Sequence, residues 1–247
     1  MTLQEFFACH PKAALGFSGG VDSSYLLYAA KAAGADVRPY FLKTPFQPRF
    51  ELDDALRLAR DLGTEVTVVE YDVLQNGTVV QNPENRCYYC KTALFRLLRQ
   101  RSQADGYAIL LDGTNASDDA GDRPGMRALR EQGVLSPLRL CGLTKDEIRQ
   151  RSREAGLFTW DKPAYACLAT RIPAGTAIDR DTLCRVEAAE AALMDLGYSD
   201  LRVRVFHGAA RIQLPRAQFP GDPEAAETLR RAVAPYFDPV LLDLKGR

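Results

Sequence analysis

The chain has 247 residues, of which 46% are hydrophobic and 26% charged, with 32 basic and 32 acidic side chains. This composition is typical of a globular protein that forms one large domain or two modest ones. The formal net charge of zero argues against a general nucleic-acid binder. No apolar run approaches the ~18–20 residues that span a bilayer, and no secretory signal is visible at the N-terminus. We therefore expect a soluble cytoplasmic enzyme.

The first two thirds of the chain alternate between short apolar runs and amphipathic helical stretches. Strands are expected at 13–17, 36–42, 65–71 and 107–111, and helices at 21–33, 50–62, 90–101 and 144–156. The last helix begins with the Thr-x-x-Glu pattern of a capping box at Thr144. This alternation predicts βαβ units, and hence an α/β fold with a parallel sheet flanked by helices.

The pattern changes after Pro173, and Gly175 interrupts it further. The elements expected beyond this point are a helix over 181–196, a hairpin of 201–206 and 210–214, a helix over 223–236 and a strand over 240–244. They predict a small C-terminal α+β domain, for substrate binding or oligomerisation. We place the boundary so that the domains comprise residues 1–175 and 176–247.

The most informative segment is Ser18-Gly19-Gly20-Val21-Asp22-Ser23-Ser24, which joins the first expected strand to the first expected helix. Ligands of open α/β sheets bind at this edge. Two glycines, the amides of a helix start and the serine hydroxyls suit an anionic phosphate. A Walker A lysine is absent, so Mg²⁺ is expected to help balance the charge. Asp22 is a candidate for placing Mg²⁺, or is an ordinary carboxylate of a first helical turn.

This segment resembles the Ser-Gly-Gly-x-Asp-Ser motif of the PP-loop ATP pyrophosphatases without a mismatch. Members of that superfamily split ATP into AMP and pyrophosphate and adenylate a carboxylate or carbonyl oxygen. The resemblance implies that residues 18–24 bind ATP and that the first domain has the adenine-nucleotide alpha-hydrolase-like fold. On the residues alone, the alternative interpretation is a glycine turn with a serine N-cap, which is a common arrangement.

Three cysteines stand out, because Cys87 and Cys90 open a helical stretch and Cys167 follows far downstream. They are compatible with a redox pair, a zinc site, three ligands of a 4Fe-4S cluster, or buried thiols without a chemical role. Zinc usually needs four protein ligands, and the two histidines lie far from both segments in sequence. Cys9, Cys141 and Cys184 fit no motif.

Polar side chains follow the expected strand at 107–111 and are candidates for nucleotide or metal contacts, or for an Asx-rich turn. They are Asp112, Asn115, Asp118 and Asp119. Arg123 and Arg127 could meet an adenylate or a substrate anion. Arg171 could stabilise a thiolate or a carboxylate, or is alternatively a surface residue. Arg202 and Arg204 lie two apart on one strand face, which suits a substrate phosphate or is a solvated face.

The order of several blocks narrows the resemblance to the LarE family, sulfur transferases that build the nickel-pincer nucleotide of lactate racemase. Besides the loop at 18–24, the blocks are Asn-Pro-Glu-Asn-Arg-Cys-Tyr-Tyr-Cys-Lys (82–91), Asp-Gly-Thr-Asn-Ala-Ser-Asp-Asp (112–119), Asp-Arg-Pro-Gly-Met-Arg (122–127), Lys-Pro-Ala-Tyr-Ala-Cys-Leu-Ala-Thr-Arg-Ile-Pro (162–173) and Leu-Arg-Val-Arg (201–204). This resemblance covers about residues 12 to 215.

The resemblance implies ATP·Mg²⁺-dependent adenylation of a carboxylate on pyridinium-3,5-biscarboxylic acid mononucleotide, followed by sulfur transfer to give a thiocarboxylate. The sulfur comes either from a sulfide on a 4Fe-4S cluster held by Cys87, Cys90 and Cys167, or from Cys167 itself, which is catalytic in both routes. The resemblance also implies ATP contacts by Asp112, Gly113, Asn115 and Arg123. It further implies substrate contacts by Glu190, Arg202, Arg204 and Arg171, and a homohexamer. Some relatives carry an acidic residue where this chain has Gln213.

Two other functions compete with this interpretation. Some tRNA thiolases also pair a PP-loop with three cluster-binding cysteines, but a protein that grips RNA phosphates usually has a basic surface. The third alternative is a nucleotide-sensing or scaffold protein whose PP-loop fold no longer catalyses a reaction. We expect a small-molecule partner and neither nucleic acid nor membrane.

Overall fold

The computed structural model describes residues 1–118 and 124–247, and the chain divides into two compact units. The first unit comprises Met1–Asp72 and Asn85–Lys162, and the second Val73–Glu84 and Pro163–Arg247. The second unit thus begins before the expected boundary at residue 175 and takes in an earlier segment. Backbone hydrogen bonds explain this division, because the amide of Ile178 donates to the carbonyl of Val80 at 2.8 Å.

The first unit is built on a four-stranded parallel sheet in the order β3-β2-β1-β4. The strands are β1 (Lys12–Gly16), β2 (Asp36–Lys43), β3 (Thr67–Glu70) and β4 (Leu110–Leu111). Parallel neighbours need crossover connections, which here contain α2 (Val21–Ala32), α3 (Arg49–Asp61) and α5 (Arg86–Ala104). The predicted α/β fold with a helix-flanked parallel sheet is therefore confirmed.

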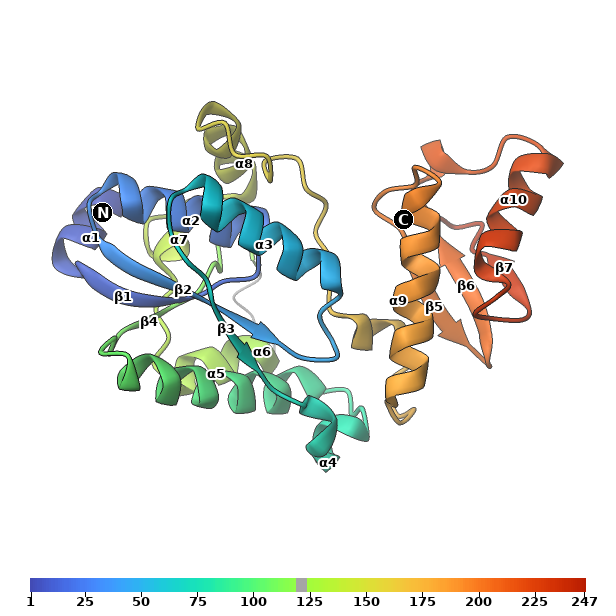
Figure 1. Ribbon diagram of the computed structural model, residues 1–247, viewed down its shortest axis with the longest axis horizontal. Helices are drawn as coiled ribbons and strands as arrows, with labels where there is room; N and C mark the ends of the chain where they lie inside the picture. Colours follow the sequence, from blue (N-terminus) through green and yellow to red (C-terminus); the bar gives the residue numbers. More distant parts are fainter. Residues whose placement is uncertain (119–123) are drawn as a thin grey trace. The chain divides into compact units, whose positions relative to one another are not determined.

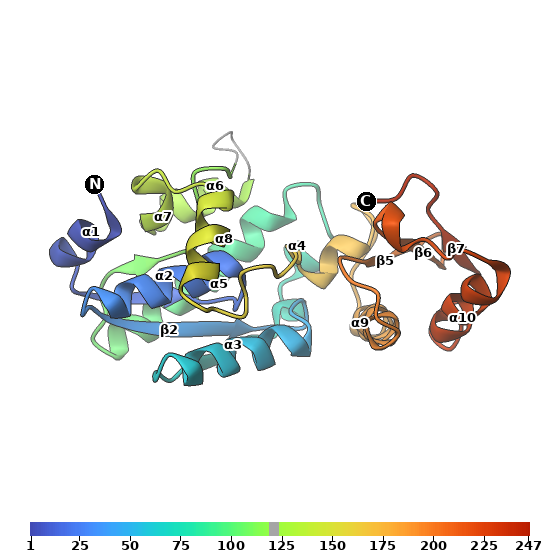
Figure 2. The same cartoon turned by 90° about the horizontal axis from the view of Figure 1, so that it is seen from above.

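The side chains of the strands alternate between two hydrophobic cores, as the period of two demands. Leu15 and Phe41 pack with α2 and α3 on one face, whereas Ala14 and Tyr40 pack with Leu98 of α5 on the other. Figure 1 shows α2 and α3 on one side of the sheet and α5 on the other, and Figure 2 shows the same elements from above. The first face is completed by residues from α1 (Leu3–Cys9), α7 (Pro137–Leu140) and α8 (Lys145–Glu154), whereas α6 (Pro124–Glu131) packs against α5.

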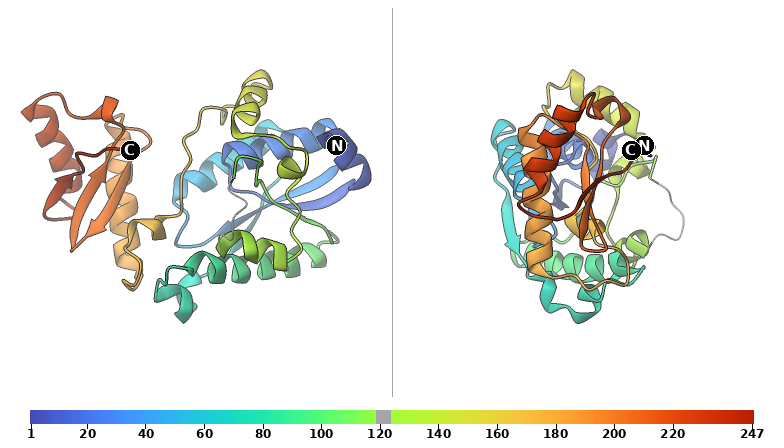
Figure 3. Two further views of the ribbon diagram at one scale, coloured as in Figure 1. Left: turned by 180° about the vertical axis from the view of Figure 1, so that it is seen from behind. Right: turned by 90° about the vertical axis from the view of Figure 1, so that its right-hand side faces the viewer.

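The second unit contains a three-stranded sheet in the order β5-β6-β7. The predicted hairpin is confirmed, because β5 (Arg202–Phe206) and β6 (Ala209–Gln213) pair antiparallel around His207 and Gly208. β7 (Val240–Leu242) adds in parallel to β6. α9 (Arg180–Asp195) packs against β5, and α10 (Pro223–Val233) packs against α9 (Figure 3). The remaining helices here are η1 (Val73–Gln75), α4 (Gly77–Val80), η2 (Leu168–Arg171) and η3 (Arg216–Gln218).

Some elements differ from those expected from the sequence. The helix expected at 90–101 begins at Arg86, and the strand expected at 107–111 is reduced to Leu110 and Leu111. The N-terminal helix α1 was not predicted, although Thr2 and Glu5 form a capping box like that confirmed at Thr144. Of the helices in the described part of the chain, none combines the length and apolar character needed to cross a bilayer.

We predict that Asn82→Ala loosens the junction of segment 73–84 with the rest of the second unit. Asn82 is buried, has a positive φ of 54°, and donates through Nδ2 to the carbonyls of Pro173 at 2.8 Å and Ile172 at 3.3 Å. Leaving buried acceptors unsatisfied costs about 1–3 kcal/mol. Amide hydrogen exchange at Gly175 and Ile178, both bonded to this segment, should accelerate about 5- to 100-fold. The exposed neighbour Gln81, changed to alanine, should leave both rates unchanged, and equal effects of the two variants would contradict this assignment.

Candidate active site

The loop with the Ser-Gly-Gly motif, residues 18–24, joins β1 to α2 and is called the PP-loop below. It is closed by the hydroxyl of Ser23. Its Oγ accepts from the amide of Ser18 at 3.3 Å and donates to the carbonyl of Gly20 at 3.2 Å. Gly20 is the N-cap of α2, and no side chain caps that helix start. Of the three serines expected to contact phosphate, Ser18 is exposed, whereas Ser23 and Ser24 are buried. Backbone amides and Ser18 are therefore the better placed donors, while Ser23 shapes the loop.

Two glycines allow the loop to lie against its neighbours. Gly19 has a positive φ of 69°, and a Cβ there would lie 3.0 Å from the backbone nitrogen of Ala55 in α3. A Cβ at Gly113, in the loop after β4, would lie 2.9 Å from the backbone nitrogen of Ser23. Side chains at either position would collide with backbone. The PP-loop is thus held between α3 and the segment that follows β4.

Asp22 is the centre of a polar network at the start of α2. Its Oδ1 accepts from Asn115 Nδ2 at 3.2 Å, so the segment after β4 meets the start of α2. Its Oδ2 accepts from Lys145 Nζ at 2.6 Å. Asp112 is buried and accepts from Ser136 Oγ at 2.6 Å, so its carboxylate is already engaged.

The segment after β4 also forms the Asx turn that was the alternative expectation. Asn115 Oδ1 accepts from the amide of Ser117 at 2.8 Å, and Asp118 Oδ2 accepts from the amide of Asn115 at 2.9 Å. The Asx-turn interpretation therefore holds for Asn115, whereas its contact with a nucleotide or metal stays a prediction. Asp119 and Arg123 lie outside the described residues. Arg127 lies over the ring of Tyr88 at 4.2 Å, where it links α6 to α5.

Two lysines that the motif did not predict reach the PP-loop from distant parts of the sequence. Lys145 starts α8 and binds Asp22. Lys162 pairs with Asp54 Oδ2 at 2.6 Å and donates to the carbonyl of Gly19 at 3.3 Å. The loop itself contains no Walker A lysine, but two lysine ammonium groups therefore lie beside it.

Cys87 and Cys90 both lie within the first two turns of α5, three residues apart and so on one face. Cys87 is exposed and Cys90 half-buried. Cys167 belongs to the second unit, where it is half-buried and precedes η2. Within either unit, over the described residues, no three His, Cys, Asp or Glu side chains gather closely enough to hold a metal ion.

Glu190 and Arg171, both expected to contact substrate, form an ion pair in the interior of the second unit. Arg171 donates through Nε to Oε1 at 2.8 Å and through Nη2 to Oε2 at 3.0 Å, and both side chains are at most 1% exposed. The amide of Val203 and the hydroxyl of Tyr165 donate to the same carboxylate. The alternative of a surface arginine at 171 is therefore wrong. Glu190 meets protein donors here, and its expected contact with substrate stays a prediction.

Arg202 and Arg204 both reach the segment before α9, as expected for residues on one strand face. Arg202 is buried and donates to the carbonyl of Ala164, whereas Arg204 donates to that of Thr170 at 2.6 Å. Burial, with the neighbouring Arg171, lowers the pKa of Arg202 to about 10 and also lowers the pKa of Arg204. A solvated strand face is therefore the wrong interpretation for Arg202.

A pocket of about 500 Å³ opens beside these arginines within the second unit. Arg204, Arg211 and His207 are among its lining residues, together with Thr170 and Arg171. Arg204 also donates through Nε to the neutral Oε1 of Gln213 at 2.6 Å. The pocket therefore presents guanidinium groups to whatever enters it, and an anion is the ligand that this charge favours.

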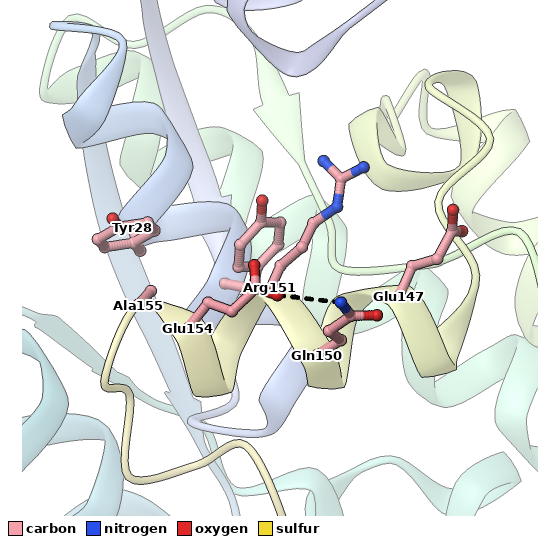
Figure 4. A pocket seen from close by; sticks show the side chains of 7 residues that line it. Tyr28, Glu147, Gln150, Arg151, Glu154 and Ala155 are labelled. Atoms are coloured by element: carbon pink, nitrogen blue, oxygen red, sulfur yellow. Dashed lines mark hydrogen bonds between the residues drawn. The ribbon is translucent and has the colours of Figure 1, made fainter.

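A second pocket, of about 600 Å³, lies between α2 and α8 and contains none of the predicted site residues (Figure 4). Tyr25 and Tyr28 line it from α2, and Arg151 and Glu154 are among the residues that line it from α8. Gln150 donates to Glu154 at 3.0 Å along the helix. Its lining combines opposite charges, and it adds no group to the PP-loop network.

No protein-family model matches the chain, but similar proteins are known. An uncharacterised protein of Synechocystis is 38% identical over 99% of this chain and 92% of its own length. Pyridinium-3,5-bisthiocarboxylic acid mononucleotide synthase of Lactiplantibacillus plantarum is 34% identical over 83% of this chain and 75% of its own length. A tRNA-specific 2-thiouridylase of Thermotoga is 24% identical over 59% of this chain and 52% of its own. Because the identity to the synthase extends over most of both proteins, the chain belongs to the LarE family of PP-loop enzymes.

Proposed function

We propose that this enzyme transfers sulfur in an ATP-dependent reaction to pyridinium-3,5-biscarboxylic acid mononucleotide, converting a carboxylate to a thiocarboxylate. One observation carries the proposal: a chain related to the Lactiplantibacillus synthase retains the whole PP-loop, with its exposed Ser18 and uncapped helix start. A helix start of this kind favours phosphate.

The first step is adenylation at the PP-loop. A carboxylate oxygen of the substrate attacks the α-phosphorus of ATP, the bond from that phosphorus to the bridging oxygen breaks, and pyrophosphate leaves with the electron pair. The residues fit a magnesium ion by their donor chemistry, because Asp22 offers a partly exposed carboxylate beside the phosphate-binding amides. Asp22 would hold the ion, which neutralises phosphate charge when bound.

The substrate nucleotide is proposed to occupy the pocket beside Arg204 and Arg211. Charge-assisted hydrogen bonds from guanidinium groups suit its phosphate or carboxylates. Gln213 supports this use, because it accepts from Arg204 without neutralising its charge. An acidic residue at 213 would instead form an ion pair with Arg204.

The second step needs a sulfur nucleophile that displaces AMP from the adenylated carboxylate. We propose Cys87, Cys90 and Cys167 as thiolate ligands of a 4Fe-4S cluster, which supplies the sulfur when bound. The i, i+3 placement of Cys87 and Cys90 on one accessible helix face fits a shared ligand, and three thiolates are a suitable donor set. The alternative donor is Cys167 alone, which would lose its sulfur and become dehydroalanine.

The enzyme should release AMP and pyrophosphate from ATP only when the substrate mononucleotide is present. Asp22→Asn should lower this rate about 100-fold or more, because an amide no longer offers the negative charge that holds the metal ion. Asp53→Asn, which neutralises an exposed carboxylate of α3, is the matched control and should leave the rate unchanged. Pyrophosphate release that ignores the substrate, or that survives Asp22→Asn, would argue against the proposal.

Anaerobic purification should give about four irons per chain, with iron lost in each of Cys87→Ala, Cys90→Ala and Cys167→Ala. Cys184→Ala is the control, because this exposed thiol lies on α9 outside the motif. Iron, acid-labile sulfide and visible absorption are the measurements. An iron-free enzyme that remains active, and whose mass falls by one hydrogen sulfide in a single turnover, would replace the cluster route with donation by Cys167.

Arg204→Gln should weaken binding of the substrate mononucleotide about 10- to 100-fold, the value of a charge-assisted hydrogen bond. Its affinity for ATP should not change. Calorimetric titration of the two ligands measures both effects, with the exposed Arg231→Gln in α10 as the control. Loss of both affinities together would point to a folding defect instead of a substrate contact.

The similarity to a tRNA-specific 2-thiouridylase favours tRNA thiolation as a second candidate function. Such an enzyme must bind RNA phosphates, so its affinity for tRNA would fall steeply with salt. Salt-sensitive tRNA binding at physiological ionic strength, together with inactivity toward the mononucleotide, would favour this candidate.

A further inference from the structure

We propose that Lys145 is the cation that contacts the β- and γ-phosphates of ATP and the departing pyrophosphate. The inference rests on the proposed function only in taking ATP as the ligand of the PP-loop. It assigns to a residue from α8 the part that a lysine inside the loop plays in Walker A proteins.

The position of Lys145 is the first support for this role. Its Nζ lies 2.6 Å from Asp22 Oδ2, so the ammonium group stands at the first turn of α2, beside the amides that favour phosphate. The side chains of Lys145 and Asp22 are 29% and 23% exposed, respectively. The pair is therefore held in place and still accessible to a ligand.

The backbone around Lys145 is fixed on both sides. Thr144 and Glu147 form a capping box, and the amide of Lys145 donates to Ser117 Oγ at 2.9 Å. Because Ser117 follows β4 and α8 packs against α2, the lysine is anchored to the elements that also hold the PP-loop. Such anchoring places a flexible side chain with little loss of freedom on binding.

Lys162 is less suited to the same role, although it also reaches the loop. Its side chain is 15% exposed, and its ammonium group pairs with Asp54 and donates to the carbonyl of Gly19. It therefore stabilises the loop from the side of α3. Lys145, by contrast, contacts the carboxylate that follows the helix start.

The chemistry of an ammonium group allows Lys145 to bind Asp22 and a phosphate at once. It has three donors and no acceptor, so one hydrogen bond to the carboxylate leaves others for phosphate oxygens. When the bond between the α-phosphorus and the bridging oxygen breaks, negative charge accumulates on the departing pyrophosphate. Lys145 stabilises that charge without giving up its proton. This contact involves the outer phosphates, which AMP does not have.

The difference between ATP and AMP provides the test. Calorimetric titration of Lys145→Ala with ATP and with pyrophosphate, each with Mg²⁺, should show affinities about 10- to 100-fold below those of the unaltered protein. Its affinity for AMP should remain within about twofold, which also shows that the variant is folded. Lys145→Arg keeps the charge and should recover most of the lost affinity.

Lys31→Ala is the matched control, because Lys31 lies at the other end of α2, roughly 15 Å away along the helix, and donates to the carbonyl of Gly63. Equal losses of ATP and AMP affinity in Lys145→Ala would overturn the inference and leave Lys145 a structural partner of Asp22. Unchanged ATP affinity would overturn it as well. Lys145→Ala could lose affinity for ATP but not for AMP while the unaltered protein transfers no sulfur. That result would support the role of Lys145 and contradict the proposed function.

Discussion

The second unit depends on one buried carboxylate, that of Glu190 in α9. Its donors come from three places in the sequence: Arg171 of η2, Val203 of β5 and Tyr165 of the preceding loop. Breaking a buried ion pair by removing one partner costs about 3–5 kcal/mol. The same guanidinium donates through Nη1 to the carbonyl of Ala166 at 2.7 Å, so this pair also fixes the backbone that carries Cys167. The buried ion pair of Arg171 with Glu190 thus positions Cys167, a residue of the proposed sulfur transfer.

The formal net charge of this protein does not show how its charged side chains are distributed. The formal net charge is zero, yet Arg204 and Arg211 line one pocket, beside the buried ion pair of Arg171 with Glu190. Burial lowers the pKa of Arg204, which means that the surroundings work against its charged form. An anion that enters the pocket would relieve this cost, because an opposite charge favours the protonated guanidinium. A balanced composition argues against general RNA binding without excluding a local anion site.

The sequence was most informative where the signal is local. Strand and helix alternation predicted the parallel sheet, and the Ser-Gly-Gly loop identified the sheet edge at which Asn115 and Asp22 meet. Contacts between distant segments could not be predicted in this way. Lys145 is 123 residues from Asp22, and Glu190 is 19 residues from Arg171. In each case the hydrophobic periodicity predicts the helix or strand but not the residue that its side chain contacts, because tertiary packing decides which side chains meet.

The glycines at 19 and 113 have a consequence for how the PP-loop binds. Their hydrogen atoms stand where a Cβ would collide with Ala55 and Ser23, so the backbone is confined from two sides. A confined loop has little conformational entropy to lose when it orders around phosphates. Nucleotide binding would then be governed by contact enthalpy and by released water. A loop without these restrictions would have to become ordered around its ligand, whereas this loop has its binding conformation before the nucleotide arrives.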